Sequence, residues 1–249
     1  MTRYLLTFLS IFAVLTMPAI KAHAAEEFTE AQKIEIKKMF EEYLLESGEK
    51  VLLSVNTYQA AIQEQDRIEA GKKAAEFLKK IEKKRDLPST GNPKGDVLMV
   101  EFFDYNCGYC SRALEEIETV LKEDDNLRVI FMDMPILGPP SVVASMWSLA
   151  AANQGKYFEY HQALMKHKGQ RDEKVLVKLA KEVGLDIDQL RKDKDSQAVK
   201  DIIDSNVNLA REVNITGTPG FIIAGQIYPG YMPADQIKTI IAEARKKKD

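Results

Sequence analysis

The two cysteines of this 249-residue chain constrain it more than any other feature, because both stand in one motif, Cys107-Gly108-Tyr109-Cys110. A disulfide across so short a loop removes little conformational entropy from the unfolded chain, so it would add little stability. A pair that served architecture would join segments far apart in the sequence. The spacing therefore indicates a chemical role for the two thiols, either as a redox pair or as half of a metal site.

The residues around the motif predict a strand, a helix and a second strand. Val97–Phe103 is a short apolar run typical of a buried strand, and Leu127–Met132 is another. Between them, apolar residues recur at helical spacing; these are Ala113, Ile117, Val120 and Leu121. This order predicts a βαβ unit with a parallel pair of strands, and hence an α/β fold.

The motif would then stand where the first strand ends and the helix begins. Free backbone N–H groups and the helix dipole stabilise a thiolate at that place, which lowers the pKa of the thiol. We expect Cys107 to be the exposed nucleophile. Cys110 lies one turn inside the helix, close enough to attack a mixed disulfide formed at Cys107 and release the substrate.

The remainder of the chain reads as a helical stretch followed by two strands and a helix. Residues 141–213 have a helical pattern throughout, and Pro139-Pro140 precedes them. Phe221–Tyr228 predicts two short strands around a turn, and Pro233 opens a last helix. The order is therefore β-α-β, a helical insertion, and β-β-α.

The chain begins with a segment typical of a secretory signal peptide. Arg3 is followed by an almost wholly apolar run and then by Ala22-His23-Ala24, which predicts a signal peptide over residues 1–24, cut after Ala24. An uncut membrane anchor is the alternative, and the short apolar run disfavours it. Export implies an oxidising compartment. We therefore expect a periplasmic protein, with attachment to the envelope left open.

Residues 25–87 are predicted to form an N-terminal helical region that begins with a capping box at Thr29. Its apolar residues recur at gaps of three and four on a charged background, a spacing typical of coiled coils. Such a stripe packs either on the following domain or on a copy of itself, and we favour self-association into a dimer or trimer. Turn-forming residues from Asp86 to Gly95 mark a linker, and a second domain is expected over residues 88–249.

Composition and the histidines argue against other partners. The chain is 45% hydrophobic and 29% charged, with a net charge of −3, which fits a globular protein and does not predict binding to nucleic acid. Half of a zinc site would need two further ligands. His161 and His167 are six residues apart, wider than zinc-finger spacing, and are interpreted as ordinary residues of a charged helical region. We expect no metal and no organic cofactor.

Two segments together carry a family resemblance. Glu101–Cys110 looks like the active-site strand and turn of DsbA-like thioredoxin-fold proteins, and Thr218-Pro219, just before the predicted hairpin, looks like their cis-proline loop. The helical run over about residues 140–213 resembles the helical domain that this family inserts. The resemblance implies a thioredoxin fold with a DsbA-type helical insertion, preceded here by the helical oligomerisation segment.

The resemblance also implies roles for individual residues. Pro219 is expected in cis beside Cys107, where the backbone of Thr218 would pair with a substrate strand. Glu101 matches a buried acid beneath the cysteines, whose raised pKa would let it relay the proton of Cys110. A carboxylate at the strand edge paired with a lysine is the alternative reading of Glu101. The dipeptide between the cysteines, Gly108 and Tyr109, is expected to tune the pair.

The direction of the reaction follows from that dipeptide. Strong oxidases of the family carry Pro-His, whose histidine stabilises the thiolate, whereas Gly-Tyr supplies no cation and implies a less oxidising couple. Gly-Tyr with a threonine before the cis-proline resembles the isomerase DsbC and the oligomeric ScsC-like proteins. We therefore expect a disulfide isomerase or reductase acting on misoxidised secreted proteins and served by a membrane redox partner.

Two other functions stay open at this point. The first is a dithiol oxidase of reduced secreted proteins, recycled by a quinone-linked membrane partner such as DsbB. The second is a non-catalytic scaffold that keeps the fold for binding, which predicts an inert, buried thiol pair with an ordinary cysteine pKa.

Overall fold

The structure, a computed structural model, describes residues 28–84 and 87–247. By internal contacts the chain divides into two units, one up to residue 59 and one from residue 60 onward. The predicted signal peptide lies outside the described residues and stays a prediction. Over residues 28–84 and 87–247, none of the helices has both the length and the apolar character needed to cross a bilayer.

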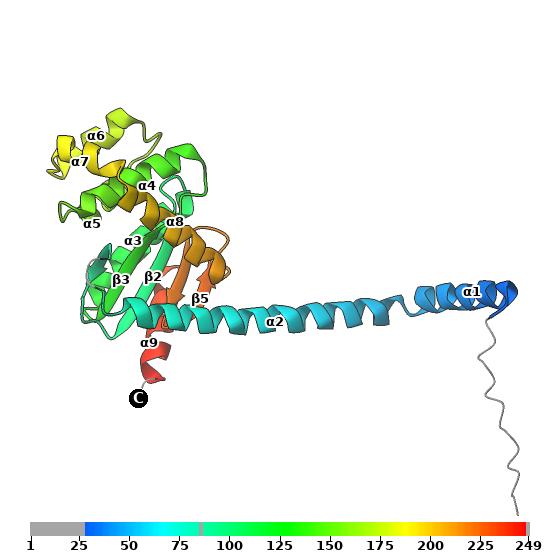
Figure 1. The fold of residues 1–249 in the computed structure, drawn as a ribbon. Helices are drawn as coiled ribbons and strands as arrows, with labels where there is room; N and C mark the ends of the chain where they lie inside the picture. The colour runs from blue at the N-terminus through cyan, green and yellow to red at the C-terminus, as the bar shows by residue number, and fades with distance from the viewer. Residues whose placement is uncertain (1–27, 85–86, 248–249) are drawn as a thin grey trace, which may run out of the picture. The chain divides into compact units, whose positions relative to one another are not determined.

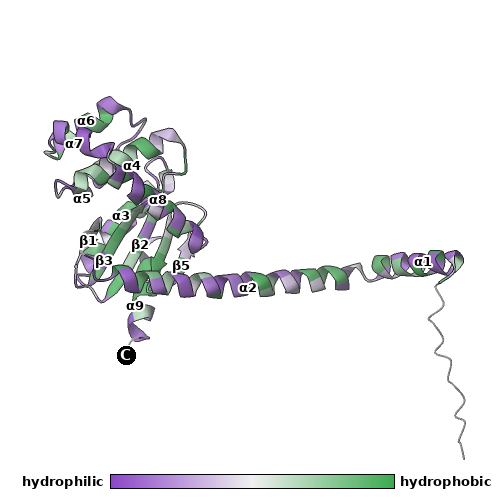
Figure 2. Ribbon diagram, in the orientation of Figure 1, coloured by the Kyte–Doolittle hydropathy of each residue, from purple (hydrophilic) through white to green (hydrophobic). Residues whose placement is uncertain are grey.

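The first unit holds helix α1 (Glu30–Glu46) and the first part of α2 (Gly48–Ile81). The predicted capping box is present: Thr29 Oγ1 accepts the backbone N–H of Gln32, whose side chain accepts the N–H of Thr29. The two helices are separated at Ser47. Figure 2 shows apolar and hydrophilic residues interspersed along both helices. Large apolar side chains that are exposed include Ile34, Met39, Phe40, Leu45, Leu52, Leu53, Val55 and Tyr58.

In the described part of the chain, the second unit is built on a five-stranded sheet with the order β1-β3-β2-β4-β5 (Figure 1). β2 and β3 are parallel, and the other neighbours are antiparallel. The predicted βαβ unit and hairpin are confirmed. The edge strand β1 was not expected, because it lies among turn-forming residues and is held only by pairing with β3. The strands are β1 Ser89–Gly91, β2 Val97–Phe103, β3 Leu127–Asp133, β4 Gly220–Ile223 and β5 Gln226–Pro229.

Helices α4 to α8 are inserted between β3 and β4, which confirms the expected thioredoxin fold with a helical insertion. In Figure 1, α4 to α7 gather at one end of the sheet, and α8 runs from them back along the sheet. The helices of this unit after α2 are α3 Gly108–Glu123, α4 Pro139–Ala152, α5 Tyr157–Lys166, α6 Glu173–Glu182, α7 Ile187–Lys194, α8 Gln197–Glu212 and α9 Ala234–Lys246.

Successive side chains of β2 face opposite sides of the sheet. Met99 and Phe103 pack into the core shared with α3, α9 and the insertion, whereas Val100 and Phe102 pack with the last turns of α2 and the end of α8. Glu101 has the same parity as Met99 and Phe103. The alternation therefore places its carboxyl group on the face covered by α3, the helix of the cysteines.

Arg128 of β3 ties down the end of α2 within the second unit. The residue is buried, and its guanidinium donates to the carbonyl oxygens of Glu82 at 2.8 Å and Lys84 at 2.5 Å. These carbonyls lie just beyond the helix C-terminus, where a cation is favoured by the dipole. The last turns of α2 are thus part of the core of the second unit.

Candidate active site

Cys107 is the residue immediately before α3, and Cys110 lies in the first turn of that helix. The backbone of Cys107 is extended, and its carbonyl accepts the N–H groups of Cys110 and Ser111. The sulfur therefore stands at the positive end of the helix dipole, as predicted. Both thiols are free; Cys110 is fully buried and Cys107 is 8% exposed. Cys107 is the more accessible of the two, although less exposed than expected.

The surroundings shift the pKa values of the two thiols in opposite directions. The pKa of Cys107 is lowered to about 6, mainly by a hydrogen bond from Cys110. Desolvation raises this pKa, whereas hydrogen bonds with the Thr218 side chain and with backbone N–H groups lower it further. Burial raises the pKa of Cys110 far above the ordinary value, and the hydrogen bond to Cys107 and the charge of Glu101 raise it further. Near neutral pH, Cys107 is therefore mainly a thiolate and Cys110 a thiol.

The cis-proline loop lies beside Cys107. The Thr218–Pro219 peptide bond is cis, and the Cys107 thiol donates to the Thr218 carbonyl oxygen at 3.3 Å. The loop reaches this position because β4, which follows it, pairs with β2, so that Gly220 stands opposite Phe102 near the cysteine end of β2. The sheet thus brings together two sites that the sequence could only suggest as neighbours.

Glu101 is sealed beneath the cysteines. It is 1% exposed, and neither carboxyl oxygen has a hydrogen-bond partner within the described part of the chain. Desolvation raises the pKa of Glu101 well above the ordinary value, and the negative charge of Cys107 adds to this rise. The alternative reading, a strand-edge carboxylate paired with a lysine, does not describe this group.

The dipeptide between the cysteines faces solvent. A Cβ atom on Gly108 would meet no atom within 4 Å, and Tyr109 is 59% exposed. The Arg112 guanidinium carbon lies 5.4 Å from the centroid of the Tyr109 ring, so a cation stands near the motif although Gly-Tyr contains none. The ring of Tyr231 lies 6.3 Å from that of Tyr109. Sequence reasoning missed both neighbours; only the three-residue spacing of Arg112 from Tyr109 offered a signal.

A buried aspartate shapes the turn before the cysteines. Asp104 accepts the backbone N–H of Asn106 at 2.8 Å and that of Leu137 at 2.9 Å, and its carbonyl accepts the N–H of Cys107 at 3.0 Å. It therefore joins the active-site turn to the loop that leads into α4. Sequence reasoning missed this residue too, although Asp-x-Asn is a turn-forming pattern.

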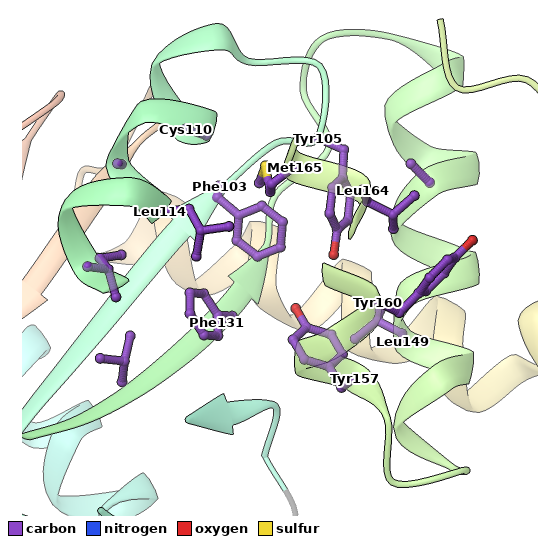
Figure 3. Packing of buried hydrophobic residues seen from close by; sticks show 14 of the residues in the cluster. Phe103, Tyr105, Cys110, Leu114, Phe131, Leu149, Tyr157, Tyr160, Leu164 and Met165 are labelled. Carbon is purple, nitrogen blue, oxygen red and sulfur yellow. The ribbon is translucent and has the colours of Figure 1, made fainter. Parts of the chain in front are cut away.

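Behind the turn lies a polar network buried between the sheet and the insertion. The hydroxyl of Tyr105 is 2.5 Å from Ser148 Oγ and 3.0 Å from His161 Nδ1, and Tyr157 donates to Asp133 at 3.0 Å. Figure 3 shows the Tyr105 and Tyr157 hydroxyls pointing toward one another. Burial raises the pKa of Asp133 to about 7, and the polar side chain of Ser145 and the hydrogen bond from Tyr157 oppose the rise.

The two histidines are not in one environment. His161 lies on α5 in an aromatic pocket with Phe103 and Phe131, and burial lowers its pKa to about 3. The prediction of a helical residue is confirmed, but its surroundings are apolar rather than charged. His167 follows the end of the same helix. Over residues 28–84 and 87–247, no cluster of three or more His, Cys, Asp or Glu side chains could hold a metal ion.

Comparison with known proteins places this geometry in a class. The model of the DSBA-like thioredoxin domain matches residues 99–242, and the chain belongs to this family. It therefore has the DsbA-like thioredoxin fold around its cysteine pair. Curated relatives that it also matches are Na⁺/H⁺ antiporters, and the chain spans about a quarter of their length (24% of that from Salinispora arenicola, at 26% identity).

Three solved structures are similar over most of their length. A thioredoxin-like oxidoreductase from Silicibacter pomeroyi is 39% identical, and the matched region covers 67% of this chain and 96% of that protein, with a TM-score of 0.64. The thiol–disulfide exchange protein α-DsbA2 from Wolbachia pipientis is 27% identical and covers 72% and 97%, with a TM-score of 0.65. ScsC from Proteus mirabilis, in a transitional conformation, is 25% identical and covers 88% and 98%, with a TM-score of 0.63.

Proposed function

We propose that this chain is a periplasmic disulfide isomerase that can also act as a reductase, with Cys107 and Cys110 as its catalytic pair. One observation carries the proposal: the accessible thiol has a lowered pKa of about 6, and the sealed one has a raised pKa. The thiolate of Cys107 is ready to attack, whereas Cys110 resists deprotonation. The mixed disulfide at Cys107 then lasts long enough for another substrate thiol to attack it.

The reaction begins when the Cys107 thiolate attacks one sulfur of a substrate disulfide. A bond forms between that sulfur and Cys107, and the second substrate sulfur leaves as a thiolate. If a substrate thiolate then attacks the mixed disulfide at its substrate sulfur, Cys107 is released unchanged and no net oxidation occurs. If Cys110 attacks instead, Cys107 and Cys110 form a disulfide, and the substrate leaves reduced by two electrons.

The neighbouring residues have assigned roles in this scheme. The backbone of Thr218, held by cis Pro219, pairs with the substrate strand beside Cys107. Glu101, as a carboxylate, accepts the proton of Cys110 when that thiol attacks, and its raised pKa makes this transfer less unfavourable. Gly108 and Tyr109 tune the couple, since they lie between the two cysteines.

Two assays on the full chain test the proposal. The first is refolding of a substrate with scrambled disulfides, and the second is oxidation of the same substrate in reduced form. We expect recovery of the native disulfides in the first assay, and loss of that recovery in Cys107→Ser. Vigorous oxidation of the reduced substrate without rescue of the scrambled one would overturn the isomerase assignment.

A dithiol oxidase is the second candidate, and one observation favours it. A Cys107 pKa of about 6 stabilises the reduced form, which makes a couple more oxidising. The same site would then accept two electrons from a dithiol and pass them to a quinone-linked membrane partner. The redox potential of the Cys107–Cys110 couple separates the two directions, because an isomerase must remain partly reduced in its compartment.

The N-terminal region supports proposals about the location and the oligomeric state of the protein. We infer secretion with cleavage after Ala24, which N-terminal sequencing of protein from a periplasmic fraction would test. We also infer a homodimer or homotrimer formed through the exposed apolar residues of α1 and the first part of α2. A deletion that tests this should end at residue 59, because Ala70, Ala74, Leu78 and Ile81 belong to the core of the second unit.

A further inference from the structure

A glutamate on α3 binds the segment that precedes α9. Glu116 Oε1 accepts the hydroxyl of Tyr231 at 2.5 Å, and Oε2 accepts the backbone N–H of Ala234 at 2.8 Å. These partners lie 115 and 118 residues away in the sequence, and both hydrogen bonds are partly buried. Because each oxygen takes one donor, the carboxylate is fixed in orientation. Hydrogen bonds to a charged acceptor are also stronger than neutral ones.

The same contact completes α9. The N-cap of this helix is Pro233, which makes no side-chain capping hydrogen bond. Glu116 supplies from α3 the acceptor that the cap residue lacks, and its negative charge suits the helix N-terminus. The short segment from Tyr231 to Ala234 is therefore held against α3 at both of its ends.

Gly230, the residue that precedes this segment, is in turn bonded to the cis-proline loop. The N–H of Gly230 donates to the carbonyl oxygen of Pro219 at 2.8 Å. The neighbouring carbonyl oxygen, that of Thr218, lies 3.3 Å from Cys107 Sγ and accepts its hydrogen bond when Cys107 is a thiol. The contacts form a ring that begins at Cys107, the residue before α3, passes through the cis-proline loop and returns to α3 at Glu116.

We propose that Glu116 is a positioning residue for polypeptide substrates: acting through Tyr231 and Ala234, it sets the place of the Thr218-Pro219 loop relative to Cys107. This rests on the proposed function, because it assigns the residue a part in the same exchange reaction. A peptide that pairs with the backbone of Thr218 presents its sulfur to Cys107 only if the loop is correctly placed. A small disulfide without a peptide backbone has no such requirement.

The test is single-turnover reduction of two disulfides by the pre-reduced, full-length protein. One substrate is a peptide with an internal disulfide and the other is 2-hydroxyethyl disulfide; each gains two electrons while Cys107 and Cys110 become a disulfide. In Glu116→Gln, we expect the half-saturating peptide concentration to rise about tenfold, as for loss of one charge-assisted hydrogen bond. The rate with 2-hydroxyethyl disulfide should not change.

Two further variants make the result specific. Glu115→Gln removes the same charge from the preceding, exposed position of α3 and should match the wild type with both substrates. Tyr231→Phe removes only the hydroxyl and should reproduce part of the peptide effect. Because Glu116 acts through Tyr231, the double variant should show less than the sum of the two single effects.

Three outcomes would overturn the inference while leaving the proposed function intact. In the first, Glu116→Gln leaves the half-saturating peptide concentration at the wild-type value. In the second, this variant has a lower melting temperature and no other change. The third is an equal loss with both disulfides, which would mean that the chemistry itself is impaired. A wild-type protein that reduces neither disulfide would instead refute the proposed function, and with it the reaction assigned to Glu116.

Discussion

The thiol of Cys107 and the carbonyl oxygen of Thr218 lie 3.3 Å apart, although 111 residues separate them in the sequence. Their contact arises from the sheet, in which β4 runs antiparallel to β2 and returns the chain to the strand that precedes the cysteines. The whole helical insertion is accommodated between the two residues. A nucleophile and the backbone that is proposed to pair with substrate therefore meet at one place.

The reactivity of Cys107 should follow a titration near pH 6. The pKa of this thiol is lowered to about 6, so the thiolate fraction rises as pH rises through that value. The rate of alkylation by iodoacetamide, measured on the reduced protein from pH 4 to 9, should show this midpoint. Because the Cys110 thiol is the main cause of the lowering, Cys110→Ala should move the midpoint upward. An unchanged midpoint in that variant would contradict the assignment.

Replacing Glu101 should affect the second chemical step and not the first. Without an acceptor for the Cys110 proton, Glu101→Gln should slow release of reduced substrate by roughly a hundredfold. The mixed disulfide at Cys107 should then accumulate, which mass spectrometry of acid-quenched reactions detects. The rate of mixed-disulfide formation, measured in a Cys110→Ser background with and without the substitution, serves as the control. Equal release rates would exclude the relay.

Replacing Glu101 with an apolar residue should make the protein more stable. The Glu101 carboxyl is 1% exposed, with no hydrogen-bond partner for either oxygen among the described residues, and such burial costs free energy. We expect Glu101→Leu to raise the free energy of unfolding by about 1–3 kcal/mol while impairing the release step. Urea denaturation of the reduced protein measures the first effect. A destabilised variant would show that the carboxyl group has a partner.

The buried carboxyl group of Asp133 should make the free energy of unfolding fall as pH rises. Burial raises its pKa in the folded state to about 7, above the value near 4 of an unfolded chain, so the folded state binds the proton more tightly. The stabilisation is fully present below about pH 4 and is lost as pH rises through about 7, by roughly 2–4 kcal/mol in total. Urea unfolding of wild type and Asp133→Asn at several pH values should show this component only in the wild type. Asp188→Asn, at an exposed position, is the matched control and should retain it.

Charges on the N-terminal helices should prevent self-association. Met39 and Val55 are apolar residues of the predicted stripe, with 62% and 46% of their surface exposed. Lysines at both positions should reduce the mass measured by light scattering to that of one chain, because burying two cations in an apolar interface is unfavourable. Lysines at the exposed positions Gln63 and Gln65 add the same charge and should leave the mass unchanged. A wild-type protein that is already monomeric would contradict the interface.

The cysteine pair, Glu101 and Thr218-Pro219 could be predicted because each is part of a short local pattern. A strand, a turn with two cysteines and a helix follow one another directly, and the parity of β2 decides which face Glu101 occupies. The proline-containing loop could be recognised because it precedes a hairpin pattern. These features report on neighbours along the chain, and the structure brings them together through strand pairing.

The partners of Glu116 could not be found in this way. Its contact with Tyr231 joins residues 115 positions apart, and nothing in the local sequence around either residue indicates the other. Asp133 was hidden for the same reason, since its burial depends on how α5 packs over the end of β3. The short strand β1 escaped detection because three residues are too few to show an alternating pattern.

The sealing of Cys110 beneath an accessible Cys107 also determines how many protons accompany the electrons. From pH 6 to 8, reduction of the pair yields one thiolate and one thiol, so two electrons are taken up with one proton. Where Glu101 has the same protonation state in the oxidised and the reduced protein, the potential of the couple should change by about 30 mV per pH unit in that range. Below pH 6 both thiols are protonated and the slope should double. The potential of an ordinary substrate dithiol changes by about 60 mV per pH unit between pH 6 and pH 8, because it takes up two protons. Acidification from pH 8 to pH 6 should therefore make the protein a weaker oxidant of such dithiols without any change in its structure.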